Sequence, residues 1–457
     1  MPKKKKKWYV HPLFLVMVSL IGSTILGLLT TFLLENRSEK IKIQQIITSI
    51  ESADKLLEQN MYDDALLKYN SLLEKVSVKS EPTLFAEIKI GEGRTYVMMS
   101  YKSNEEENLK KAIASFDEAN DIYAEDKYPE KFAIIEGNLA NAYLGLSEIR
   151  DKENNLLNAI NSNLKALEIF NNQKNIEKAA VKLLNIGVCY ECLSEVKEKE
   201  KNLNLAINSY TKSIETFVEN KYPTEFATAQ LNLANAYLKI SYIKNKEENV
   251  LKSIDSNEKA IKVFTLETYP GDYANIKINE GNAYERYSTF KDKLQNLKKA
   301  LDSYEDALAI YTMDKYPSNY ALTKVNIAST YTDLAKSTNS KEDLTKSFEA
   351  LQEVLKIFNI EDYPEYYAFA MINLGEYYNA LAEMDNENDA FSKAISSFEE
   401  ALKIFTFEAY PLDYSVIQYD LLETYTKLSA IENKNENLEK AYNAQKEAQR
   451  AEEYSLK

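Results

Sequence analysis

The sequence predicts an all-α protein in which one membrane-spanning helix precedes a solenoid of antiparallel helix hairpins. Two observations predict this fold class. A segment near the amino terminus, residues 12–34, contains no charged residue. Behind it, a pattern with a period of 47 residues runs to the last residue, Lys457. Periods of about 20–50 residues are typical of repeat architectures, so the period is the deciding feature.

Residues 12–34 (PLFLVMVSLIGSTILGLLTTFLL) are predicted to span a membrane. At about 1.5 Å per residue they form a helix of about 34 Å, which is enough to cross a bilayer. A cleaved signal peptide has a shorter apolar core of about 7–15 residues and an Ala-x-Ala-like site behind it, and this sequence has neither. We therefore expect an uncleaved signal anchor, with a basic segment before it (1–11) and a helical juxtamembrane linker behind it (35–44).

The charges beside the anchor favour a cytoplasmic amino terminus. Five lysines, residues 3–7, precede the anchor, whereas Arg37, Lys40 and Lys42 follow it. By the positive-inside rule, the solenoid of this single-pass cell-membrane protein would lie outside the cytoplasm. A cytoplasmic solenoid is the alternative, because the difference in charge is small.

One face of the predicted anchor carries small residues. Ser19, Ser23, Gly27 and Thr31 recur at every fourth position, which would allow a second helix to approach closely. This spacing favours a homodimer through the anchor. The alternative is that these residue types, which are common in spanning helices, have no such role.

Eight units of 47 residues fill the range 82–457. Tyr-Pro occurs at 128–129, 222–223, 269–270, 316–317, 363–364 and 410–411, and only Asn175-Ile176 interrupts the series. A tyrosine column continues without insertion or deletion through Tyr96, Tyr143, Tyr190, Tyr237, Tyr284, Tyr331, Tyr378 and Tyr425. Residues 45–81 contain a shorter hairpin. The predicted solenoid, 45–457, therefore consists of nine hairpins.

Each unit contains two helical patterns. In the second unit, Pro129 stands where the first turn of a helix tolerates proline, and small or apolar residues follow at helical spacing to about Ile149. A polar stretch, 150–154, comes next, and Asn155 is expected to cap the second helix. Each unit is therefore predicted to be an antiparallel αα-hairpin.

These units resemble the tetratricopeptide repeat (TPR). The stretches 138–143 (NLANAY) and 281–284 (GNAY) are similar to its first helix, and Ala159, Ala166 and Leu167 are similar to its second. The lead-in Pro-x-x-[Tyr/Phe]-Ala, as in 317–321, resembles the longer kinesin-light-chain type. The resemblance covers 45–457 and implies a right-handed superhelical solenoid that binds proteins.

Two columns on the first helices are the candidate binding residues. The first column is Asn138, Asn185, Asn232, Asn279, Asn326 and Asn373. The second, about one turn further on, is Arg94, Asn141, Asn235, Asn282, Ser329 and Glu376. The resemblance implies that the asparagines hold an extended peptide in a concave groove. The alternative is that these amides bond to the neighbouring hairpin, since buried amides usually find partners inside the protein.

The residue before each asparagine bears on what could be bound. These residues are Gly137, Leu184, Leu231, Ile278, Val325 and Ile372. The basic residues with which some TPR proteins grip a terminal carboxylate are therefore absent at this place. An apolar set favours a ligand with hydrophobic or aromatic anchors, although apolar columns at helical spacing are usually core.

The Cys189-x-x-Cys192 motif is not expected to be a redox site. Redox pairs need a helix amino terminus that lowers the pKa of one thiol, and this pair is predicted to lie in the middle of a helix. Cys189 falls in the column of Ala142 and Ala236, which is typical of a small core residue. Because the third unit also lacks Tyr-Pro, we expect it to form the least regular joint.

Charge and composition restrict the function further. The formal net charge is −15, and the chain after the lysine run carries 51 basic and 71 acidic residues, or −20, which disfavours nucleic acid as a partner. His11 is the only histidine, and no phosphate-binding loop or catalytic set is present in the sequence, so we expect no enzyme activity, metal or cofactor. We expect a membrane-anchored scaffold that binds a protein or peptide segment. The alternative is an architectural or self-assembling spacer that captures no peptide.

Overall fold

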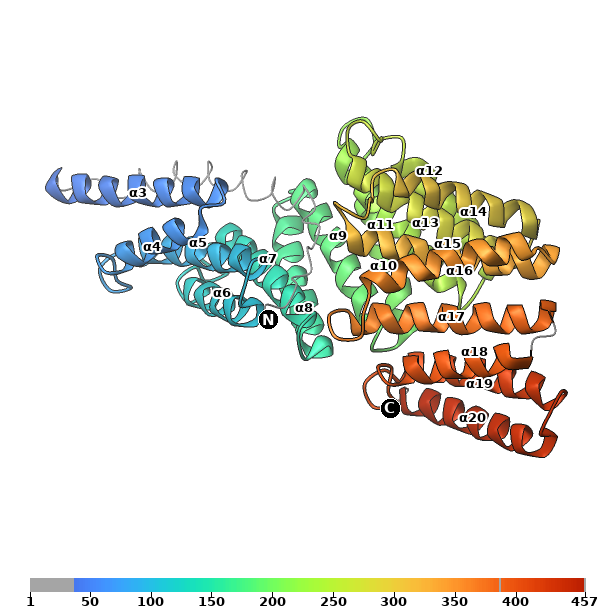
Figure 1. Cartoon of the computed structure of the whole chain (residues 1–457). Coiled ribbons are helices and arrows are strands. Elements are labelled where there is room, and N and C mark those ends of the chain that lie inside the picture. Colours follow the sequence, from blue (N-terminus) through green and yellow to red (C-terminus); the bar gives the residue numbers. More distant parts are fainter. Residues whose placement is uncertain (1–36, 386–387, 456–457) are drawn as a thin grey trace. The chain divides into compact units, whose positions relative to one another are not determined.

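The computed structural model describes residues 37–385 and 388–455, which form helices joined by short turns (Figure 1). The predicted basic segment 1–11, the anchor 12–34 and its dimer face (Ser19, Ser23, Gly27 and Thr31) lie outside the described residues. Within the described ranges, no helix is both long enough and apolar enough to cross a bilayer. The anchor and the dimer therefore stay predictions.

The described chain divides into two compact units, and the division falls between Ala236 and Tyr237, inside α11 (Pro223–Ser241). The helices of the amino-terminal unit before α11 are α3 (Arg37–Glu58), α4 (Tyr62–Leu73), α5 (Pro82–Ser100), α6 (Glu105–Asn120), α7 (Pro129–Ser147), α8 (Lys152–Asn172), α9 (Ile176–Leu193) and α10 (Lys199–Thr216). Those of the carboxyl-terminal unit after α11 are α12 (Lys246–Ala260), α13 (Pro270–Ser288), α14 (Lys293–Leu308), α15 (Pro317–Thr338), α16 (Lys341–Ile357), α17 (Pro364–Asp385), α18 (Asn388–Leu402), α19 (Pro411–Ser429) and α20 (Lys434–Ser455).

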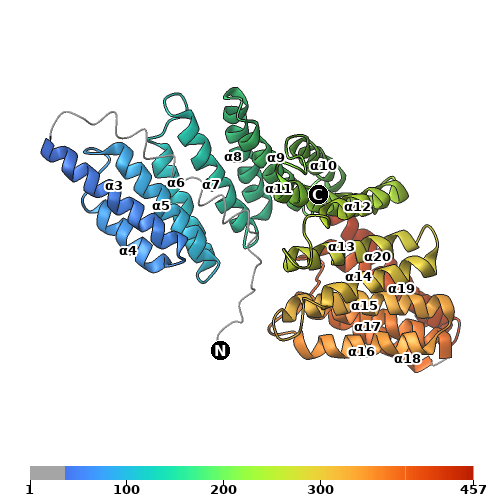
Figure 2. The same cartoon turned by 90° about the horizontal axis from the view of Figure 1, so that it is seen from above.

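Consecutive helices pair into hairpins, and the hairpins stack. In both units the first helix packs against the second, as in α7 with α8 and α13 with α14, and the second packs against the next first helix, as in α8 with α9 and α14 with α15. Figures 1 and 2 show the helices of each unit following one another side by side in chain order. The predicted all-α solenoid of antiparallel hairpins is confirmed for the described residues.

The first hairpin incorporates part of the predicted linker. Helix α3 begins at Arg37 and continues without a break to Glu58, so no boundary separates residues 37–44 of the linker from the hairpin. Ile43 is only 8% exposed and packs in one cluster with Ile46, Ile47 and residues of α4 and α5. The end of the linker is therefore part of the core of the first hairpin.

The turns inside the hairpins share one backbone conformation. Residues at a spacing of 47 adopt positive φ between 40° and 54°, and they are Asn104, Asp151, Glu198, Asn245, Asp292, Asn339 and Asn433. Asparagine and aspartate tolerate this left-handed region better than other residues with a side chain, because their short polar groups can bond locally. Glu198 is the exception.

The predicted capping role of Asn155 is wrong. Helix α8 already begins at Lys152, with Asp151 before it, so Asn155 lies at the end of the first turn. Its Nδ2 donates to the carbonyl oxygen of Arg150 at 2.8 Å and ties the turn to the helix. The same bond recurs at Asn108, Asn202, Asn249, Asn296 and Asn437, with distances of 2.6–2.9 Å.

Several hairpins are closed by a size match between their two helices. A Cβ added to Gly281 of α13 would lie within 2.7 Å of the ring of Tyr304 in α14. The equivalent pairs Gly93–Phe116, Gly187–Tyr210 and Gly375–Phe398 show the same close approach. Where the glycine is replaced by Ala140 or Ala234, the ring position holds Asn163 or Asn257. Small residues on the first helix thus accompany large rings on the second, and larger ones accompany smaller partners.

The joint before α9 differs from the others. At the other joints, the tyrosine of Tyr-Pro packs on an aromatic ring five residues earlier, with ring centroids 5.1–5.5 Å apart. Here Asn175 replaces that tyrosine. The ring of Phe170 is instead contacted by Lys178, whose Nζ lies 5.4 Å from the ring centroid. Helix α8 continues to Asn172, and Lys174 turns the chain with a φ of 56°.

Candidate binding face

The two predicted columns lie on the first helices of successive hairpins, and we call the surface that carries them the ladder face. Their side chains are half-buried, except that of Arg94, which is 9% exposed. Such partial exposure allows contact with a ligand and with the neighbouring hairpin alike. Their hydrogen bonds therefore decide between these two roles.

In the carboxyl-terminal unit, part of the ladder face is bonded internally. Asn326 of α15 donates its Nδ2 to Oδ1 of Asn282 on α13 at 3.1 Å, and the hydroxyl of Ser329 donates to Oε1 of Glu285 at 3.1 Å. The Tyr304 hydroxyl donates to Asn282 at 2.7 Å and to Glu285 at 3.0 Å. Asn282, Asn326 and Ser329 thus help to hold α13 to α15, as in the alternative reading of the columns.

Other members of the columns are engaged differently. Asn373 donates to the carbonyl oxygen of Phe369 on its own helix, at 2.9 Å. Arg94 forms an ion pair with Asp54 of α3 at 3.5 Å, and Asp54 also accepts from the hydroxyl of Tyr69 at 2.9 Å. Arg94 therefore has a structural role in the first hairpins.

Asn138 stands apart from these residues. Its Nδ2 is buried and has no hydrogen-bond partner within the described part of the chain. A buried amide donor without an acceptor costs about 1–3 kcal/mol. A ligand that supplied an acceptor would remove this cost.

The structure adds carboxylates that the sequence analysis missed. Asp420 and Glu423 on α19 continue the two columns 47 residues after Asn373 and Glu376. Asp420 has a buried Oδ2 with no partner among the described residues. The 47-residue spacing identifies both positions, although neither side chain is an amide.

These carboxylates influence one another across helices. Burial, together with Glu376 and Glu423, raises the pKa of Asp420 to about 7. Burial raises the pKa of Glu285 to about 7, although the hydrogen bonds from Tyr304 and Ser329 act in the opposite direction. Burial also raises the pKa of Glu376, while the exposed Lys336 lowers it. Three acidic groups of the carboxyl-terminal unit, Glu285, Glu376 and Asp420, thus have raised pKa values, whereas the hydrogen bond from Lys427 lowers the pKa of Glu423.

Cys189 has the expected role of a small core residue. It is 1% exposed, packs against Leu156, Ala159 and Leu193, and forms no disulfide. Burial raises the pKa of its thiol, which disfavours a reactive thiolate.

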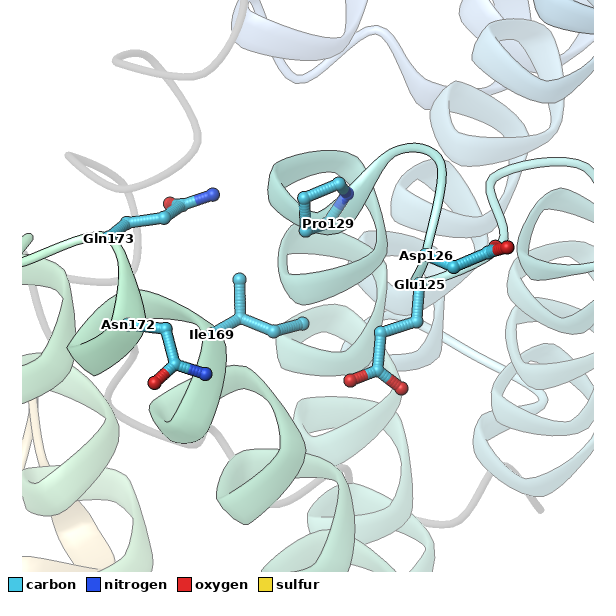
Figure 3. A pocket seen from close by; sticks show the side chains of 6 residues that line it. All are labelled: Glu125, Asp126, Pro129, Ile169, Asn172 and Gln173. Atoms are coloured by element: carbon cyan, nitrogen blue, oxygen red, sulfur yellow. The ribbon is translucent and has the colours of Figure 1, made fainter.

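A pocket of about 520 Å³ lies near the irregular joint (Figure 3). Figure 3 shows Ile169, Asn172 and Gln173 at the end of α8 opposite Pro129 and Glu125, and Asp126 completes the lining. The pocket contains no member of the two columns. It is therefore separate from the ladder face.

Comparison with known proteins supports the fold. No family model matches the chain, and no curated protein matches it. The apo form of RapI superimposes with a TM-score of 0.53 at 13% identity, covering 90% of this chain and 98% of RapI. A Rap protein complexed with competence and sporulation factor has a TM-score of 0.46 at 14% identity, with coverage of 90% and 99%. The TPR domain of P58(IPK) has a TM-score of 0.22 at 14% identity, with coverage of 90% and 99%. The likeness to RapI, which is the one of these three with a TM-score above 0.5, supports the TPR-like helical-repeat fold.

Proposed function

We propose that this protein is a membrane-anchored scaffold that holds a protein or peptide segment against its ladder face. The observation that carries the proposal is that Asn138 and Asp420, which occupy the same column, each have a buried polar atom without a partner among the described residues. Buried polar groups are normally satisfied in folded proteins. A segment bound to either unit could satisfy the unpaired atom of that unit, with an acceptor for Asn138 or a donor for Asp420.

Photo-crosslinking tests this proposal in the protein's own membrane. Phe369 lies one helical turn before Asn373, and its ring packs on that of Phe405 with centroids 5.0 Å apart, while 39% of the residue stays exposed beside the first column. Replacing Phe369 with benzoylphenylalanine should crosslink a discrete partner protein. Tyr442 on α20 is 66% exposed and serves as the matched aromatic control on a second helix. An identical crosslinking pattern at both positions, or none at Phe369, would argue against the proposal.

The anchor belongs to the same proposal. The uncharged segment 12–34 and the lysines before it support a cytoplasmic amino terminus and a solenoid outside the cytoplasm. A protease added to sealed cells should digest the solenoid, and a protected solenoid would reverse the orientation. The likeness to kinesin-light-chain repeats also stays part of the proposal, and the Pro-x-x-[Tyr/Phe]-Ala lead-in supports it.

A specific observation favours a second candidate, an architectural spacer. Asn282, Asn326 and Ser329 use their hydrogen bonds inside the stack, as expected if the columns only stiffen the solenoid. Such a spacer would self-assemble or span a membrane complex without gripping a segment. Sedimentation of the full chain in detergent should then show concentration-dependent assembly that Asn138→Ala leaves unchanged.

A further inference from the structure

Lys182 of α9 occupies a position that is otherwise part of the core. Its equivalents at a spacing of 47 are all 0% exposed, and they are Ile88, Ile135, Ala229, Ile276, Thr323, Ala370 and Ile417. Lys182 itself is 5% exposed. A lysine in such a column is unexpected, because burial of an unpaired charge costs several kcal/mol.

The space for this lysine comes from a glycine that replaces a large apolar residue on the preceding first helix. Gly137 of α7 stands where other units have large apolar residues, such as Leu184, Leu231 and Ile278. The Nζ of Lys182 fills the place that a Cβ at residue 137 would take. The glycine and the lysine are thus complementary, and together they bring an ammonium group beside the ladder face.

This ammonium has no acceptor among the residues that the structure describes. Lys178, one turn earlier, is a second cation, and it is already paired with Glu130 at 2.7 Å. Glu136, which precedes Gly137, accepts from Lys165 of α8 at 3.0 Å and from Asn120 of α6 at 3.2 Å, so it is directed towards the second helices. Burial, together with Lys178, lowers the pKa of Lys182 to about 8.

The register of the stack places a second unpaired donor next to Lys182. Contacts between first helices join residues 44 or 45 positions apart, as in Asn326 with Asn282 and Asn379 with Thr424, and the contact of Lys182 with Gly137 has the same offset. The residue 44 positions before Lys182 is Asn138, whose buried Nδ2 also has no partner in the described chain. Two donors, one of them charged, therefore lack acceptors at the same place.

We propose that Lys182 and Asn138 form a binding site for a carboxylate of the captured segment, with Gly137 providing the space. A carboxylate has two acceptor oxygens and one negative charge, which match two donors and one positive charge. This inference rests on the proposed scaffold function and adds the chemistry of one contact. The carboxylate belongs either to an aspartate or glutamate side chain or to a chain terminus.

Ligand-observed ¹⁹F relaxation on the full chain in detergent tests the site. The probes are trifluoroacetyl-Gly-Asp-Gly-amide for a side-chain carboxylate, trifluoroacetyl-Gly-Gly-Gly for a terminal one, and trifluoroacetyl-Gly-Asn-Gly-amide as the neutral control. At least one carboxylate probe should bind at millimolar concentration, and the neutral probe should bind at least tenfold more weakly. The stronger of the two carboxylate probes identifies the source.

The matched variant combines Gly137→Leu with Lys182→Ala, which reproduces the Leu184 and Ala229 pair of the next joint. It should retain the helical circular dichroism of the wild type and lose carboxylate binding at least tenfold. Equal binding of the carboxylate and neutral probes, or equal binding by wild type and variant, would overturn the site. Inorganic phosphate that displaces the probe at lower concentration than acetate would overturn the ligand class.

The scaffold proposal can fail or survive separately. Crosslinking from residue 369 that persists in the double variant, without any carboxylate binding by the wild type, would leave the scaffold standing and remove this site. Binding of a carboxylate probe without any crosslinked protein would support this site and contradict the scaffold proposal.

Discussion

The two compact units carry the same columns, but among the described residues the first column holds an unpaired donor, Asn138, in one unit and an unpaired acceptor, Asp420, in the other. In the amino-terminal unit the unpaired atom of the first column is the donor Nδ2 of Asn138, and the buried ammonium of Lys182 lies on the next first helix. In the carboxyl-terminal unit the unpaired atom of the first column is a carboxylate oxygen of Asp420, and burial raises the pKa values of Asp420 and of the hydrogen-bonded Glu285 to about 7. One backbone pattern thus supports two different surfaces through single substitutions within a column.

The largest expected effect concerns the acidic side of this comparison. Because Glu285 has a pKa of about 7 when folded, above its ordinary value of 4.5, the folded state binds more protons between those pH values. The carboxyl-terminal unit should therefore lose stability as pH rises from about 4.5 to 7. Glu285→Gln should reduce this loss and stabilise α13 and α15 at pH 8 by up to about 3 kcal/mol.

Hydrogen exchange of α13 and α15 peptides, read by mass spectrometry at pH 5.5 and 7.5, measures this change locally. Glu305→Gln on the exposed side of α14 is the matched control and should change exchange little. A faster exchange in Glu285→Gln than in the wild type at pH 7.5 would contradict the expectation.

The basic side should respond to pH in the opposite direction. The pKa of Lys182 is lowered from 10.5 to about 8, so the folded state binds fewer protons than the unfolded state between these values. The amino-terminal unit should therefore gain stability as pH rises from about 8 to 10.5. Lys182→Met should remove this gain and stabilise α7 and α9 at pH 7 by about 2–3 kcal/mol.

The urea concentration at which half of the helical circular dichroism is lost, compared at pH 7, 8.5 and 10, checks the prediction. Lys178→Met, which removes an exposed cation from the same helix, is the comparison variant. If the urea midpoint depended on pH in the same way in Lys182→Met as in the wild type, the ammonium of Lys182 would be solvated.

Two glycine substitutions compare how tightly the units are packed. Gly281→Ala would press a methyl group against the ring of Tyr304, whereas Gly137→Ala would meet only the end of the Lys182 side chain. We expect Gly281→Ala to destabilise the protein by about 1–3 kcal/mol. Gly137→Ala should be neutral or slightly stabilising, since alanine favours the helix by up to about 1 kcal/mol and the lysine can move.

Urea denaturation of both variants under one condition tests this contrast. Adding Tyr304→Asn to Gly281→Ala, after the pattern of Ala140 with Asn163, should recover part of the loss. If both single variants lost the same free energy of unfolding, the side chain of Lys182 would be as fixed as the ring of Tyr304.

The smallest expected effect concerns the turn before α10. Glu198 has a φ of 40°, where the other turns of the series have asparagine or aspartate. Glu198→Asn should stabilise the protein by about 0.5–1 kcal/mol, because asparagine tolerates the left-handed region better. A decrease in the urea midpoint would indicate that the ion pair of Glu198 with Lys201, at 2.8 Å, matters more than the backbone.

The periodic features of the fold could be predicted from the sequence because they depend on local chemistry. Pro129, Pro270 and Pro317 begin helices in the structure because the first helical turn tolerates a residue without an amide hydrogen. Asn155 was misassigned because the left-handed residue Asp151 starts the helix one turn earlier, and a position of this kind is hard to recognise in one sequence.

The candidate site was only partly predictable. The two columns could be read from the sequence, but the bonds between Asn326 and Asn282 depend on the offset between neighbouring helices. Lys182 was missed for the same reason. The other residues of its column are core residues, and its contact with Gly137 is between two neighbouring hairpins. The polar groups that now define the site are those whose surroundings depend on a neighbouring repeat.

The two kinds of size match have different consequences for rearranging the repeats. The pair Gly281 and Tyr304 lies within one hairpin, so that hairpin could be duplicated or exchanged as a module without repacking the pair. The pair Gly137 and Lys182 links two hairpins. Inserting another repeat between them would leave the lysine facing a leucine or isoleucine and the glycine facing a void. Recombination at this point should therefore be disfavoured, and the second and third units should be inherited together.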